Sequence, residues 1–361
     1  MSRGPLFGAF WPTEKQEALL RLVLGDDDVE RRWRELQPLD LDLLDLGSFC
    51  MLPLLHTRLA AAQIDDPLAD RIAGTYRRTW YRNQLELRCL STAVAQIEEQ
   101  GVTPIVFGGA SLAARFYGHL AHRPLPQLDL LVRPEEAAAP RDALLRSGDW
   151  RVDQERPGYL RLENHDHIVL VLHRGLPSYL AGAAGPGDAL ERLRPRTQRV
   201  TLGSAETGVL GPADEVVVAC GLGARVKTPS SIQWLLDITA VLASGECLPE
   251  ALVAAASELN LIAAVRNSIE YLDRVQERVD LAGFRTALRP AAVDASRRER
   301  AAFFLGGIGG RFGSNAQRLA TLSRSTMDAS PSQTLSVVSA GFHDLWKGRR
   351  RRSIGRDSRQ P

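Results

Sequence analysis

Apolar residues recur at three- and four-residue steps through the first hundred positions, which is the period of amphipathic helices. Thr13 and Gln16 form a capping pair that predicts the start of a first helix. A second helical stretch is predicted from Asp40 to Leu59, divided or kinked at Pro53. The interval from Pro67 to Gln100 contains no further proline and one glycine, so a single long helix is predicted there.

From Val102 the pattern changes to short apolar runs bounded by glycine, proline and other turn residues. Strands are predicted at 104–107, 128–132, 159–163 and 166–173, with a helix at 110–117. Period two along the last of these strands places His167, Val171 and His173 on one face. Helical periodicity returns at Asp214.

These changes of pattern divide the chain into four predicted regions: an N-terminal helical region at 1–100, an α/β core at 101–210, a C-terminal helical region at 211–345 and a basic flexible tail at 346–361. The predicted fold class is α/β, or α+β, with a small mixed sheet flanked by helices on both sides in the chain. The glycine-rich connection at 181–188 is predicted to be a linker, and the glycine cluster at 306–313 a helix break.

Composition narrows the class of protein. The 361 residues are 44% hydrophobic and contain no uncharged apolar run of about 18 residues, so a packed core without a membrane span is predicted. The first residues do not follow the pattern of a secretory leader, and a cytoplasmic location is expected. Four scattered cysteines lack a CxxC pair, which favours buried thiols over a disulfide framework or a zinc site.

Charge is nearly balanced, and the formal net charge of +2 gives no general nucleic-acid footprint. The positive excess is local, in the run Lys347 to Arg352 of the tail. Two interpretations remain for the tail: a solvated terminus, or a segment that binds an acidic partner, nucleic acid or a membrane surface. A second basic cluster lies on the long helix and indicates either a solvated face or a phosphate groove; its members are Arg77, Arg78, Arg82 and Arg88.

The stretch from Val102 to Val132 carries the candidate chemistry. A strand leads into Gly108 and Gly109, a helix follows, and a second strand contains the carboxylate Asp129. Backbone amides at the start of a helix bind phosphate, and arginine or lysine side chains pair with phosphate oxygens. The predicted nucleotide- or phosphate-binding residues are Gly108, Gly109, Ser111, Arg123 and Lys227.

Four segments in this order resemble a known family. They are Gly108-Gly109-Ala110-Ser111-Leu112, Tyr117, Arg123-Pro124 and Gln127-Leu128-Asp129-Leu130-Leu131-Val132. The set resembles the uncharacterised nucleotidyltransferases of the polymerase-β-like superfamily, which commonly read K-G-x-x-L, Y, R-P and D-h-D-h-L-V. Two flanking segments, Leu52 to Leu55 and Trp234 to Ile238, resemble the helical patterns of the same family.

The resemblance implies a small mixed sheet and a site that uses Mg²⁺ and a nucleoside triphosphate. In the superfamily, two aspartates on one strand and a third carboxylate on a neighbouring strand hold two Mg²⁺ ions, which neutralise the triphosphate and stabilise displacement of pyrophosphate. Here Gln127 stands at the first aspartate, Val171 at the third carboxylate and Gly108 at the lysine. Only Asp129 remains, so the sequence predicts a degenerate catalytic motif.

Two replacements for the missing ligands are open. Asp129, His167 and His173 would form a site for zinc, iron or manganese if they share one face. Alternatively, Glu163 or Asp166 supplies a displaced carboxylate from the hairpin turn.

Two functions follow as hypotheses. The favoured one is a catalytically degenerate nucleotidyltransferase-like protein, a pseudoenzyme that binds a nucleotide, a phosphorylated small molecule, or a peptide or protein partner. The alternative is an active metal-dependent transferase that moves a nucleotidyl group to a peptide, protein or small-molecule hydroxyl through Asp129. The resemblance also suggests an accessory role in a bacterial natural-product or polysaccharide pathway. It leaves the donor, the acceptor and the oligomeric state open.

Overall fold

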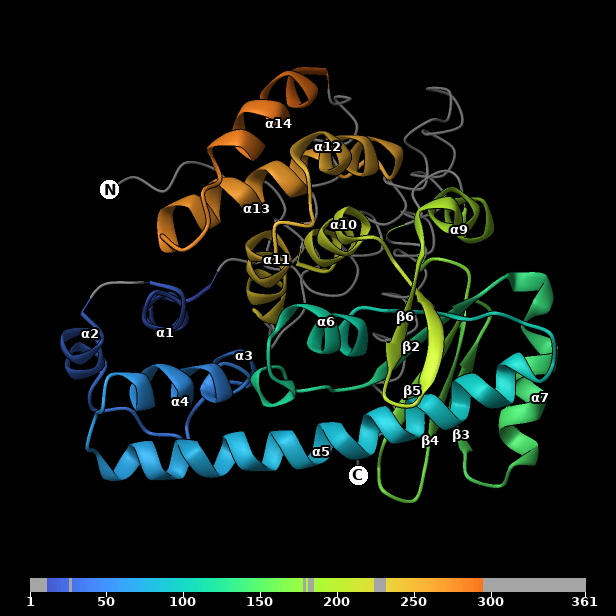
Figure 1. Ribbon diagram of the computed structural model, residues 1–361, viewed down its shortest axis with the longest axis horizontal. Coiled ribbons are helices and arrows are strands. Elements are labelled where there is room, and N and C mark those ends of the chain that lie inside the picture. Colours follow the sequence, from blue (N-terminus) through green and yellow to red (C-terminus); the bar gives the residue numbers. More distant parts are fainter. Residues whose placement is uncertain (1–11, 26–27, 178–179, 181–184, 224–231, 295–361) are drawn as a thin grey trace, which may run out of the picture.

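The computed structural model describes residues 12–25, 28–177, 180, 185–223 and 232–294. These residues form a mixed seven-stranded sheet between helical layers, with further helices before and after it in the chain (Figure 1). The predicted α/β class and the small mixed sheet are therefore confirmed. The sequence predictions on Lys227, on the glycine cluster at 306–313 and on the basic tail Lys347–Arg352 lie outside the described residues. So do residues 181–184 of the predicted linker, whereas its last residues belong to a helix at Pro186–Leu193.

The N-terminal helices follow the sequence pattern in part: the helical stretch predicted from Asp40 begins only at Leu46, and the helix at Val29–Glu35 was not predicted. Helix α1 (Glu14–Leu24) starts at the predicted capping box, in which Thr13 and Gln16 satisfy each other's backbone amides. Helices α2 (Val29–Glu35), α3 (Leu46–Phe49) and α4 (Leu52–Ala61) come next, and α5 (Pro67–Glu98) is the predicted long helix. Pro53 lies in the first turn of α4, where its missing N–H costs nothing, so the break expected at Pro53 falls just before it.

The sheet has the strand order β3-β4-β5-β2-β1-β7-β6. Its strands are β1 (Ile105–Phe107), β2 (Leu128–Val132), β3 (Arg151–Arg156), β4 (Tyr159–Glu163), β5 (Val169–Arg174), β6 (Gln198–Leu202) and β7 (Ala205–Val209). Strand β2 lies at the centre, antiparallel to β1 and parallel to β5. The sequence missed β3, β6 and β7, because β3 and β6 are mostly exposed and polar and show no clear apolar alternation.

The two faces of the sheet pack against different helices. One face contributes Ile105, Phe107 and Leu131 to the core that contains α6 (Gly109–Phe116), α9 (Pro186–Leu193), α10 (Pro212–Gly223) and α11 (Gln233–Ala243). The other face contributes Val106 and Leu130 to the core formed with α5 and α7 (Ala138–Arg146). Figure 1 shows α5 along one side of the sheet and α6 and α10 on the other.

Short 3-10 turns and a C-terminal helical layer complete the fold. The turns are η1 (Leu120–His122), η2 (Pro134–Glu136) and η4 (Arg194–Arg196). The outer helices are α12 (Pro249–Glu258), α13 (Ile262–Val275) and α14 (Ala282–Asp294). Within the part of the chain that the structure describes, none of the helices combines the length and apolar character that a membrane crossing requires.

Candidate functional site

Asp129 lies in the middle of the sheet, on the face that packs against α6 and α10. In the register, Asp129 pairs with Phe107 of β1 on one side and with Val171 of β5 on the other. Paired residues of neighbouring strands point to the same face, as Tyr159 and His173 also do. The sheet therefore brings Asp129 and Val171 side by side, as the two-residue periodicity predicts.

The carboxylate of Asp129 is engaged by two neighbours. Its Oδ1 atom accepts hydrogen bonds from Nε2 of Gln127 at 2.7 Å and from Nε2 of His173 at 2.8 Å. A carboxylate only accepts, so this contact places the proton of the imidazole on Nε2. The side chains of Asp129 and His173 are 14% and 12% exposed, so solvent reaches them only in part.

The rest of this face adds one cation and two aromatic rings. Arg161 donates from Nη1 to the amide oxygen of Gln127 at 3.3 Å and from Nε to Asp153 at 2.7 Å. The ring of Phe107 meets His173 edge-on at 5.3 Å between centroids, and the ring of Tyr159 lies at 6.4 Å. The face of the sheet around Asp129 therefore carries one imidazole and one guanidinium.

These side chains do not fit a pair of Mg²⁺ ions. Magnesium takes oxygen ligands, and the amide oxygen of Gln127 already faces a guanidinium while its amide nitrogen faces Asp129. One carboxylate remains where two dications need several negative charges. Among the described residues, no group of three or more histidine, cysteine, aspartate or glutamate side chains is placed to hold a metal ion.

The predicted grouping of Asp129, His167 and His173 is wrong at His167. Strand β5 begins at Val169, and His167 lies in the preceding turn with φ +55°, so the period-two argument does not extend to it. Its exposed ring bonds to Glu163 at 2.6 Å. Glu163 also pairs with Arg151 at 3.1 Å, so it forms part of the hairpin's own ion pairs and is not a replacement ligand beside Asp129.

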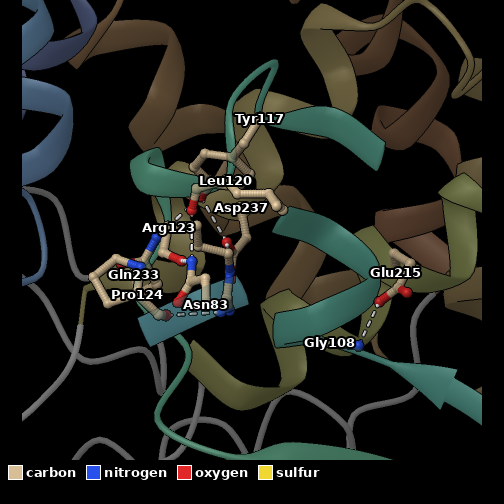
Figure 2. Close-up of polar contacts among 9 residues, drawn as sticks. All are labelled: Asn83, Gly108, Tyr117, Leu120, Arg123, Pro124, Glu215, Gln233 and Asp237. Atoms are coloured by element: carbon tan, nitrogen blue, oxygen red, sulfur yellow. Dashed lines mark hydrogen bonds and ion pairs between the residues drawn. The ribbon is translucent and has the colours of Figure 1, made fainter. Parts of the chain in front are cut away.

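The glycine turn contacts an internal anion. Gly108 has φ 63° and ψ −130°, a conformation open mainly to glycine, and α6 begins at the next residue. The Gly108 amide donates to Oε2 of Glu215 at 3.1 Å (Figure 2). Glu215 comes from α10 and is 1% exposed. A carboxylate thus lies where the positive end of the α6 dipole would meet phosphate.

Burial controls the protonation of Glu215. Loss of solvent raises the pKa of Glu215 to about 7, although hydrogen bonds from Ser111 and Gly108 and the charge of Arg115 favour the ionised form. Its second oxygen, Oε1, is buried without a hydrogen-bond partner among the described residues. Ser111 is itself fully buried and accepts from Arg115 at 3.3 Å.

The structure places Arg123 inside the protein. Its Nε and Nη2 atoms donate to the two carboxylate oxygens of Asp237 at 2.8 and 2.9 Å, and both side chains are less than 10% exposed (Figure 2). A Cβ atom on Gly109 would lie 2.8 Å from Nη1 of Arg123, so Gly109 gives this ion pair its space. In this structure the side chains of Arg123 and Asp237 bond to each other, and Arg123 does not line an open surface.

Glu215 and Asp237 are the residues that the sequence did not identify as part of the site. Each is a buried acid in a mostly apolar helix, Pro212–Gly223 or Gln233–Ala243. Such a carboxylate needs a buried partner, which is a signal available in the sequence. The partners, Gly108 and Arg123, lie more than a hundred residues away and are not apparent from spacing.

The comparison with protein families agrees with the pattern of motifs. A sequence model of the family described as "Uncharacterised nucleotidyltransferase" matches residues 50–276, more than half of the chain. Among solved structures, the chain is similar to an antigenic nucleotidyltransferase-like protein from Paracoccidioides brasiliensis, with 12% identity and a TM-score of 0.34. That alignment covers 55% of this chain and 96% of the other. No curated protein sequence matches this chain.

Proposed function

Because the chain belongs to the uncharacterised nucleotidyltransferase family, we propose that it binds a nucleotide or another phosphorylated ligand and does not carry out two-metal nucleotidyl transfer. One observation supports this above all. The single carboxylate at the centre of the sheet, Asp129, is hydrogen-bonded through one oxygen to both Gln127 and His173. These contacts make Asp129 part of a polar network within the protein.

The charge at this position argues against two-metal chemistry. Gln127 and Val171 replace two of the three carboxylates that the family pattern implies, and Val171 is buried and apolar. Each catalytic group of this kind is worth roughly 10² to 10⁴ in rate, so the combined effect on metal-dependent transfer is large. A site with one carboxylate, one imidazole and one guanidinium lacks the negative charge that two Mg²⁺ ions require.

The side chains on the same face of the sheet indicate the class of ligand. Arg161 is 35% exposed and pairs with the exposed carboxylate of Asp153 at 2.7 Å. A phosphate would compete with Asp153 for this charge-assisted donor. The half-exposed ring of Tyr159 lies near His173 and offers a flat apolar contact for a base or another planar group. The proposal therefore places the phosphate of the ligand at Arg161, on the Asp129 side of the sheet.

A second function, nucleotidyl transfer to a hydroxyl, is favoured by one observation. Asp129 bonds Nε2 of His173, and a carboxylate that orients an imidazole is an arrangement used to accept a proton from a nucleophile. In this case Asp129 would position His173, and the ring would take the proton of the acceptor hydroxyl.

Calorimetric titration with ATP, GTP, CTP and UTP, each with and without Mg²⁺, separates the two functions. We expect binding that does not depend on Mg²⁺, no release of pyrophosphate, and weaker binding in Arg161→Gln. Asp142→Ala is the matched control for Asp129→Ala, because Asp142 is exposed on α7. Release of pyrophosphate that is lost in Asp129→Ala and kept in Asp142→Ala would establish the transferase instead. If none of the four nucleotides, phosphate or pyrophosphate binds, the proposed ligand class is wrong.

A further inference from the structure

Helix α5 carries exposed aromatic and arginine side chains on its solvent side. We call this row the α5 stripe; its members are Arg77, Trp80, Tyr81, Gln84 and Arg88. The spacing of three and four residues keeps them along one side of the helix. Trp80 is 44% exposed and Tyr81 63% exposed, in contrast to the buried residues of α5 that pack on the sheet. Adjacent exposed aromatic residues of this size indicate a contact surface.

The stripe is positively charged without internal compensation. Between residues 74 and 97 the helix carries four arginines and one carboxylate, Glu86, which is buried and paired with Arg82 at 2.8 Å. Within the described ranges of the chain, no carboxylate forms an ion pair with Arg77, Arg78 or Arg88. Their charges are available to an anionic partner.

A group of planar rings continues the stripe at one end. We call it the ring group; its members are His56, Tyr76, His119 and His122, from α4, α5 and the η1 segment. Tyr76 lies one turn before Trp80 and stacks on the exposed ring of His119, with centroids 5.5 Å apart and planes 13° apart. The hydroxyl of Tyr76 also bonds Nδ1 of His119 at 2.9 Å.

Two of these histidines favour the neutral form of the imidazole, because their pKa values are lowered. Burial, followed by the positive charge of Arg77, lowers the pKa of His56. Burial lowers the pKa of His122, and the two other histidines of the ring group add to this effect. Arg77 therefore lies close enough to His56 to act on its charge, which connects the ring group to the α5 stripe.

We propose that the α5 stripe and the ring group bind single-stranded nucleic acid, a function beyond the proposed ligand site on the opposite face of the sheet. Bases stack on aromatic side chains and on arginine, while arginine pairs with phosphate. Arg77 and Arg88 are 11 residues apart, about 16 Å along the helix, which matches roughly five stacked nucleotides. An acidic peptide would use the arginines but has no need of exposed flat rings. Because the net charge of the chain is only +2, the electrostatic attraction for a nucleic acid must come from local clusters of positive charge such as this surface.

Binding of a fluorescein-labelled 12-nucleotide oligouridylate to the full chain tests the proposal by anisotropy at several salt concentrations. Trp80→Ala and Tyr81→Ala are each expected to weaken binding at least about fivefold, and Tyr81→Phe to restore it, because phenylalanine keeps the stacking face. Arg77→Gln and Arg88→Gln are each expected to reduce the slope of log K against log salt by about 0.7. Arg34→Gln is the matched control, since Arg34 is exposed on α2 and pairs with Glu30.

The alternatives give different results. The basic run Lys347–Arg352 also attracts oligouridylate by charge, so binding that none of the α5 variants changes would overturn the proposal. Poly-glutamate that competes as well as unlabelled oligouridylate, with no effect of Trp80→Ala or Tyr81→Ala, would assign the surface to an acidic protein partner instead. Trp80 also reports directly: oligouridylate should quench tryptophan fluorescence in the natural chain, and less in Trp80→Phe, which keeps a ring for stacking.

Discussion

Glu215 shows how a single residue of the same chain can take the place of the phosphate that a glycine turn is expected to bind. A glycine turn before a helix offers backbone amides to an anion, yet here the Gly108 amide already donates to a carboxylate of the same chain. Ionised Glu215 is costly to bury, since one oxygen has no hydrogen-bond partner among the described residues. Because the pKa of Glu215 is about 7, this free-energy cost of burying the ionised carboxylate arises as the pH rises through neutrality.

Replacing Glu215 by glutamine should flatten the pH dependence of stability. The folded pKa of about 7 lies above the ordinary value of 4.5, so the folded state holds more protons than the unfolded state between these values. The free energy of unfolding therefore falls as pH rises from about 5 to 8, by about 3 kcal/mol from this group alone. Denaturant titrations of Glu215→Gln at pH 5, 6, 7 and 8 should lack this part of the fall.

The control for this comparison is Glu206→Gln, because Glu206 is 72% exposed on β7. Its profile should follow that of the natural chain. A Glu215→Gln profile parallel to the natural one would show that Glu215 is not the titrating group. Of the neighbouring charges, Arg115 lowers the pKa of Glu215 and Asp237 raises it.

How much of the candidate site the sequence predicts depends on how far apart in the chain the interacting residues are. The positions of Gln127, Asp129 and Val171 on one face follow from period two, because strand geometry repeats locally. The bonds from Gly108 to Glu215 and from Arg123 to Asp237 join segments over a hundred residues apart. No local pattern contains them. Phosphate binding by Gly108, Gly109 and Ser111 therefore stays a prediction. In this structure the Gly108 amide already donates to Glu215, and the Ser111 hydroxyl accepts from Arg115.

Among the elements, the segment before β2 is fixed to α11 by a buried ion pair. Arg123 and Asp237 meet through two hydrogen bonds, and the hydroxyl of Tyr117 donates to Asp237 at 2.7 Å. Asn83 of α5 holds the same segment by donating to the Arg123 carbonyl at 2.8 Å. The pair thus connects α5, the η1 segment and α11 at the edge of the candidate site (Figure 2).

Breaking this pair on one side should be costly. Asp237→Asn leaves a guanidinium buried without its counter-charge, and we expect a loss of about 3–5 kcal/mol in the free energy of unfolding. The double variant Arg123→Met, Asp237→Leu should recover part of the loss, because it removes both charges. Asp153→Asn is the control: Asp153 pairs with Arg161 at the exposed edge, where the cost should be below about 1 kcal/mol. An equally small loss in Asp237→Asn would mean that the buried pair does not hold these elements together.

Helices were easier to predict than strands for a physical reason. The 32 residues of α5 repeat one apolar face many times, so Pro67–Glu98 was predicted within two residues. Strands β2 and β4 were predicted at their observed limits, because their apolar runs end at turn residues. Strand β3 has little buried surface and is held by pairing with β4, a tertiary contact that the sequence pattern does not contain.

In the whole molecule, the sheet separates the two proposed binding surfaces. Asp129 faces the layer of α6 and α10, whereas α5 packs on the opposite face through residues such as Leu90 and Val94. Changes on sites that share no partners usually add within about 0.3–0.5 kcal/mol. The two surfaces should therefore behave as independent sites.

A double variant measures this independence. Arg77→Gln should leave nucleotide binding at the Asp129 face unchanged, and Arg161→Gln should leave oligouridylate binding unchanged, each within about twofold. The double variant Arg77→Gln, Arg161→Gln should then show both single effects and no additional one, in calorimetry with nucleotide and in anisotropy with oligouridylate. A change of more than about threefold in the affinity of the other site would show that a substitution on one face of the sheet affects binding on the other face. The two binding sites would then be energetically coupled.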